Sequence, residues 1–79
     1  MTYRIDLHGY NVEQAISRII LGMLNAQDQG YDNVLIITGN GTGAMKLTVE
    51  EYLTSENIDF EIIQEGNYLV WIEYEDEYY

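Results

Sequence analysis

The sequence contains no cysteine and no proline, and only three of its 79 residues are lysine or arginine. Without cysteine the chain forms neither a disulfide nor a thiolate metal site, which fits a reducing compartment, and we expect a cytoplasmic protein. Its apolar runs are far shorter than the roughly 20 residues that cross a bilayer, so we expect no membrane contact. Apolar residues make up 47% of the chain, enough for one small core, so we expect a single domain over residues 1–79 with an acidic tail at 74–79.

Acidic residues outnumber basic ones by fourteen to three, which gives a net charge of −11. A polyanion generally repels nucleic acids and anionic membranes, so the acidity either favours solubility or attracts a basic partner. The charge is unevenly distributed, however. From Asn33 to Val49 there is no acidic residue, and Lys46 is the only charged one. This segment also contains a glycine-rich loop.

Hydrophobic periodicity and turn residues predict the element order β-α-β-α-β-β. Asn11 is a good N-cap for the first helix, with Gln14 as its capping-box partner, and Gly30 is placed to end it. Apolar residues at helical spacing run from Val12 to Leu24 and predict the buried face of that helix. The predicted strands cover residues 3–7, 34–37, 59–64 and 68–74; the second helix covers 45–57, and a turn lies at 65–67.

Right-handed crossovers put both helices on one face of the sheet, so we predict an α/β, two-layer sandwich. The last strand is apolar on both faces and suits the interior, whereas Asp59 and Glu61 suit an edge strand. We therefore predict a four-stranded mixed sheet of order 1-2-4-3, with the fourth strand antiparallel to the others. The other face of this sheet stays open, and aromatic side chains of the last strand that point there are candidates for a contact patch.

The glycine-rich loop reads IITGNGTGA at residues 36–44, with glycines at 39, 41 and 43. Such glycines bring backbone amides close to a ligand just before a helix, which is a natural anion site. Thr38 and Thr42 add hydroxyls, and Lys46 adds a positive charge. The alternative is a tight strand-to-helix turn without a ligand. A nucleotide cofactor is disfavoured because the loop follows the second strand, and because methionine stands where a P-loop needs glycine before its lysine.

The sequence IDLHG at residues 5–9 ends the first predicted strand, and parallel pairing places it beside the glycine loop. Asp6 and His8 are two residues apart, so their side chains project to the same side of an extended backbone. His8 can transfer protons near neutral pH, and Asp6 could orient its ring. The alternatives are a local cap for Asp6 and a hydrogen-bonded turn residue for His8.

The two motifs together resemble those of the Smr (small MutS-related) domain family, in which LDLHG is followed by an H/T-G-x-G-T-G loop. This sequence has ITGNGTG at residues 37–43 as the second motif, and the similarity covers roughly residues 4–74. The family resemblance implies the β-α-β-α-β-β fold, nucleic-acid binding, and in some members cleavage of DNA or RNA. By position, Asp6 and His8 would be catalytic. The residues facing phosphates would be Gly9, Thr38, Gly39, Asn40, Gly41, Thr42, Gly43 and Lys46.

Two functions follow from this resemblance. One is an endonuclease for RNA or DNA, with no resident cofactor; a divalent ion such as Mg²⁺ is compatible, although one carboxylate and one imidazole form a small ligand set. The other is a non-catalytic module that docks on RNA, the ribosome or a basic protein partner. Thr38 and Asn40 stand where many members of the family have histidine and a basic residue, so this sequence has fewer cations at the loop.

Overall fold

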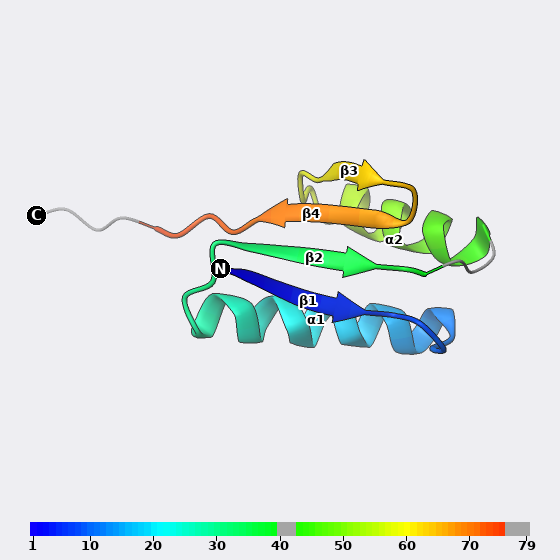
Figure 1. Ribbon diagram of the computed structural model, residues 1–79, viewed down its shortest axis with the longest axis horizontal. Helices are drawn as coiled ribbons and strands as arrows, with labels where there is room; N and C mark the ends of the chain where they lie inside the picture. Colours follow the sequence, from blue (N-terminus) through cyan, green and yellow to red (C-terminus); the bar gives the residue numbers. More distant parts are fainter. Residues whose placement is uncertain (40–42, 76–79) are drawn as a thin grey trace, which may run out of the picture.

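The computed structural model describes residues 1–39 and 43–75. The element order confirms the prediction (Figure 1). The predicted tail lies partly outside the described residues, at 76–79. The elements are β1 (Thr2–Asp6), α1 (Val12–Asp28), β2 (Asn33–Ile37), α2 (Gly43–Ser55), β3 (Glu61–Gln64) and β4 (Asn67–Trp71).

The four strands form one sheet of order β1-β2-β4-β3, as predicted. Strand β1 runs parallel to β2, and β4 runs antiparallel to both β2 and β3. Strand β3 therefore lies at an edge, where the exposed carboxylate of Glu61 stays hydrated, whereas Asp59 lies just before the strand. Its pairing with β4 extends from Glu61 opposite Leu69 to Gln64 opposite Asn67, with an irregularity between Ile62 and Gln64.

Helix α1 begins and ends where its sequence predicts. The Asn11 side chain accepts a hydrogen bond from the backbone N–H of Gln14, and the Gln14 side-chain carbonyl accepts one from the backbone N–H of Asn11. Gly30 has a φ of 77° just after the helix. The predicted buried face was partly wrong, because Val12, Ile20 and Leu24 are 41 to 60% exposed. The residues that α1 buries are instead Ala15, Ile19, Gly22 and Ala26.

Small side chains explain this difference. Gly22 lies directly against β1, since a Cβ atom at this position would be 2.4 Å from Ile5 Cδ1. A helix that approaches a sheet so closely contacts it along a narrow stripe, and the flanking apolar residues remain at the surface. No helix in residues 1–39 or 43–75 combines the length and hydrophobicity that a membrane crossing requires.

The core lies between one face of the sheet and the two helices. Alternate strand residues, Ile5, Ile36 and Tyr68 among them, pack with α1 and with Met45, Val49 and Leu53 of α2. Strand residues of the opposite parity, such as Leu35 and Leu69, are outside this core. Both helices therefore cover the same face, as predicted. Of the aromatic residues on β4, Tyr68 faces the helices, whereas Trp71 is 58% exposed.

The chain direction divides the molecule into two ends. Strands β1 and β2 both end where α1 and α2 begin, and the β3–β4 turn lies at this same end (Figure 1). We call this end, with residues 6–9, 38–39, 46 and 65–67, the rim. The helices finish at the other end of the sheet, where β4 leads toward the carboxyl terminus.

Candidate functional site

Two turns meet at the rim. The backbone N–H of Leu7 donates to the Ile37 carbonyl at 2.8 Å, which continues the parallel pairing one residue beyond β1. This bond places residue 8 opposite the start of the glycine loop. A Cβ atom on Gly39 would be 3.3 Å from Nδ1 of His8, so the imidazole lies against Gly39. Gly39, the first glycine of the loop, and His8 therefore lie at the same surface.

The carboxylate of Asp6 holds the backbone of the histidine turn. Its Oδ1 atom accepts a hydrogen bond of 2.9 Å from the His8 backbone N–H. The Tyr10 N–H closes the turn on the Leu7 carbonyl at 3.1 Å, and Gly9 between them has a φ of 82°. Asp6 thus fixes the turn rather than the ring, because the hydrogen bonds of the described residues include none between its carboxylate and the imidazole. The His8 side chain stays exposed.

Thr38 joins the glycine loop to the β3–β4 turn. Its backbone N–H and its hydroxyl both donate to the Gly66 carbonyl, at 2.9 and 3.1 Å. Thr38 is buried, and its hydroxyl is thus used inside the fold. Gly66 has a φ of 79°, and a Cβ atom there would be 2.7 Å from the Thr38 hydroxyl oxygen and 3.2 Å from the Gly39 carbonyl. Only glycine fits this position without a shift of its neighbours.

Lys46, in the first turn of α2, forms an ion pair across the rim. Its Nζ atom is 2.5 Å from Oε1 of Glu65 in the β3–β4 turn. This hydrogen bond from Lys46, with the positive charge that accompanies it, holds the pKa of the Glu65 carboxyl below its usual value. The lysine proposed to meet phosphate therefore already has an anionic partner, which an incoming phosphate has to displace or share.

Glu65 was missed by sequence reasoning, which treated it as an ordinary turn residue. The signal was present in the predicted strand order. Because β4 pairs with β2, the turn before β4 has to lie beside the end of β2 and the loop that follows it. A carboxylate in that turn is consequently within reach of a lysine at the start of α2.

Four more residues were predicted to face phosphates. Asn40, Gly41 and Thr42 lie outside the described residues, and Gly43 is exposed at the first position of α2. Within the described part of the chain, no three histidine, cysteine, aspartate or glutamate side chains come together as a metal-binding group. The chemistry visible at the rim therefore consists of an exposed imidazole, a glycine backbone, and a lysine paired with glutamate.

These observations define a small two-layer α/β domain in which the turns after two parallel strands meet at one rim. The Smr domain model matches residues 5–65, and the chain belongs to this family. The family resemblance inferred from the two sequence motifs is thereby confirmed.

The similar curated proteins are much longer. Endonuclease MutS2 of Brevibacillus brevis is 45% identical over 51 residues, which are 65% of this chain and 6% of that protein. Endonuclease MutS2 of Levilactobacillus brevis is 37% identical over 57 residues, 72% of this chain and 7% of that protein. The chain thus corresponds to a small part of these relatives.

Solved structures show the same fold. The crystal structure of the human small-MutS related domain is 30% identical and has a TM-score of 0.70, with 87% of this chain and 99% of that chain covered. The solution structure of the B3BP Smr domain has a TM-score of 0.78 over 90% of this chain and 78% of that one. At 24% identity, the second likeness supports the fold alone.

Proposed function

We propose that the rim binds one phosphate group of a nucleic-acid backbone and that His8 catalyses cleavage of the adjoining phosphodiester bond. The observation that carries this proposal is the contact between the His8 imidazole and Gly39. A phosphate bound at the glycine backbone would thus lie within reach of a group that exchanges protons. Family membership and the endonuclease names of the similar proteins support it.

The phosphate-binding half of the proposal rests on backbone chemistry. Gly39 has a φ of 75°, which only glycine adopts at little cost, and the loop that it begins leads into the N-terminus of α2. The N–H groups at a helix N-terminus carry partial positive charge and are not used by the helix itself. Such a terminus favours an anion, and it needs no lysine to do so.

The catalytic half assigns a proton transfer to His8. The imidazole removes a proton from a water molecule as the water oxygen forms a bond to phosphorus. The bond from phosphorus to the leaving oxygen breaks, and this oxygen takes up a proton. Asp6 is a positioning residue in this scheme, because its carboxylate holds the backbone N–H of His8 and thereby the turn that presents the ring.

A cleavage assay on purified protein tests the proposal. We expect the wild-type protein to cut single-stranded RNA or to nick supercoiled DNA, and His8→Ala to lose this activity while keeping its fold. Thr54→Ala is a matched control, because Thr54 is exposed at the far end of α2. If all three preparations cut equally, the activity comes from a contaminating nuclease and the proposal fails.

A second candidate is a module that binds RNA, DNA or the ribosome without cutting. The Lys46–Glu65 ion pair favours it, because a neutralised lysine adds little to the charge stabilisation that phosphodiester cleavage needs. In this case the wild-type protein binds nucleic acid, and neither the wild type nor any variant cuts the strand. Phosphate-driven binding is recognised by an affinity that falls steeply as the salt concentration rises.

A further inference from the structure

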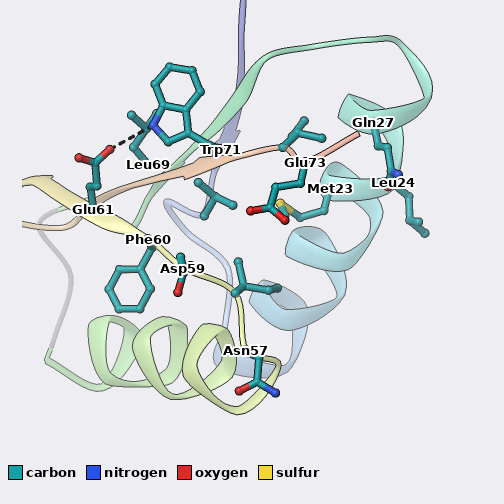
Figure 2. A pocket seen from close by; sticks show the side chains of 13 residues that line it. Met23, Leu24, Gln27, Asn57, Asp59, Phe60, Glu61, Leu69, Trp71 and Glu73 are labelled. Carbon is teal, nitrogen blue, oxygen red and sulfur yellow. Dashed lines mark hydrogen bonds between the residues drawn. The ribbon is translucent and has the colours of Figure 1, made fainter. Parts of the chain in front are cut away.

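A groove lies at the end of the molecule opposite the rim. It is bounded by the second half of α1, the connection between α2 and β3, and the last residues of β4 (Figure 2). We call it the distal groove; its volume is about 530 Å³, which is in the size range of ligand-binding clefts. Its apolar lining includes Met23, Leu24, Ile58, Phe60, Val70 and Ile72.

Carboxylates surround this apolar lining. Figure 2 shows Asp59, Glu61 and Glu73 around the groove, with the Glu61 carboxylate accepting a hydrogen bond of 3.1 Å from the Trp71 indole. No lysine or arginine is among the lining residues, all of which belong to the described part of the chain. The distal groove thus combines an apolar floor with uncompensated negative charge.

The helix ends add to the negative potential. Helices α1 and α2 finish at Asp28 and Ser55, close to the groove residues Gln27 and Asn57, and neither helix has a basic residue in its last turn. The carboxyl end of a helix carries partial negative charge, which favours a nearby cation. Backbone and side chains therefore both favour a positively charged occupant.

The backbone of β4 offers hydrogen bonds along this groove. The pairing of β3 with β4 ends at Glu61 and Leu69, so β4 continues beyond its neighbour (Figure 1). The Ile72 N–H donates to the Asp32 carbonyl on the β2 side. Because successive residues of a strand point their backbone groups to opposite sides, those of Trp71, the last residue of β4, point away from β2, to the side that β3 does not fill.

We propose that the distal groove docks a short, extended, basic segment of a partner protein. A large apolar side chain of that segment would enter the groove, lysine or arginine residues on either side would meet the carboxylates, and its backbone would pair with Trp71. A second copy of this chain is a poor occupant, since each copy has a net charge of −11. The same charge opposes nucleic acid at this end.

Synthetic peptides provide a direct test on the whole chain. The probes are short peptides with a central leucine flanked by lysines, compared with the same peptide flanked by glutamates, in fluorescence anisotropy titrations. We expect binding of the basic peptide only. Chemical-shift changes in amide spectra should be concentrated at Met23, Leu24, Ile58 and Glu73, and binding should not alter the rim.

Matched variants separate the groove from the general acidity of the protein. Leu24→Lys and Glu73→Lys should each weaken peptide binding about tenfold or more, equivalent to about 1.4 kcal/mol. Leu21→Lys and Glu51→Lys are the controls: Leu21 is on the same helix and as exposed as Leu24, but lies outside the groove, and Glu51 is an exposed acid on α2. The controls should change the affinity by less than about twofold.

Several outcomes overturn the proposal. Equal weakening by Glu51→Lys and Glu73→Lys would show that net charge alone attracts the peptide. Shift changes at the rim, or an unchanged affinity in Leu24→Lys, would place the binding elsewhere. Absence of binding combined with self-association that Leu24→Lys abolishes would identify a second copy as the occupant.

Discussion

The two ends of the molecule differ in the groups that form their surfaces. The rim consists of backbone: Gly9, Gly39 and Gly66 adopt positive φ angles there, and a histidine ring lies on one of these glycines. The distal groove consists of apolar side chains with carboxylates around them. The net charge of the chain therefore does not describe both ends, because Thr38, Gly39 and Lys46 of the rim come from the acid-free segment 33–49, whereas Asp59, Glu61 and Glu73 line the groove.

The largest expected effect follows from removal of the histidine. If the rim cleaves phosphodiesters, His8→Ala should lower the cleavage rate by about 100-fold or more, the usual contribution of a general acid or base. It should leave the affinity of the groove for basic peptides unchanged, since the groove is formed at the other end of the sheet. A rate assay and a peptide titration on the same preparation check both statements. A loss of both functions would mean that the two ends are not independent.

Gly66→Ala should damage the rim through its backbone. The added Cβ atom would meet the Thr38 hydroxyl at 2.7 Å and the Gly39 carbonyl at 3.2 Å, and alanine is strained at a φ of 79°. We expect a loss of about 2–3 kcal/mol in the free energy of unfolding, measured by urea denaturation.

Gly9→Ala is the control that isolates the strain. Gly9 has a similar φ of 82° but no heavy atom within 4 Å of the added Cβ. Gly9→Ala should lower the free energy of unfolding by about 1 kcal/mol, from the unfavourable backbone conformation alone. Equal losses in the two variants would mean that Gly66 does not pack tightly against the end of β2.

The sequence predicts this architecture largely through local signals. The capping box at Asn11 and Gln14, the order of the helices and strands, and the position of the charged strand at an edge follow from signals within short segments, and all are confirmed. The meeting of His8 and Gly39 also follows, since parallel strands bring their carboxyl ends together.

Other features depend on how closely the layers approach, and periodicity does not report that distance. It indicates the apolar side of α1 but not how much of that side the sheet covers, so Leu24 was assigned to the core although it lies at the surface. The ion pair between Lys46 and Glu65 joins residues from two elements and depends on the register of β4 with β2. The distal groove arises because β3 does not extend along the whole of β4. The hydrophobic pattern of a sequence defines the length of a strand poorly.

Gly22→Ala tests how closely α1 packs on the sheet. Helix α1 begins beside the rim and ends beside the groove, and between these ends Gly22 lies directly against Ile5 of β1. The added methyl group would overlap with the buried Ile5 side chain, at a cost of about 2 kcal/mol, which exceeds the roughly 1 kcal/mol that alanine gains in helix propensity. We expect a net loss of about 1 kcal/mol in urea denaturation. Ser17→Ala, at an exposed position of the same helix, should be nearly neutral, and a stabilised Gly22→Ala would contradict this packing.

The smallest expected effect concerns Glu65, the acid that pairs with Lys46. Glu65→Gln should release Lys46 for phosphate and raise the affinity for a nucleic-acid strand by about two- to fivefold at low salt. Glu51→Gln removes the same charge from an exposed position on α2 outside the rim and should have a smaller effect. Equal gains in the two variants would attribute the change to net charge alone, and fluorescence anisotropy distinguishes these outcomes.

The pH dependence of binding gives a second test of the competition between Glu65 and phosphate for Lys46. The folded-state pKa of Glu65 lies below its unfolded value, so the ion pair stabilises the fold above the usual carboxyl range and is lost as the pH falls through the lowered pKa. Protonation of Glu65 frees Lys46 in the same way as Glu65→Gln does. The affinity of the wild-type protein should therefore rise toward that of Glu65→Gln as the solution is acidified, and the ratio of the two dissociation constants should approach one. A ratio that stays constant over the acid range would show that Glu65 does not compete with phosphate for the lysine.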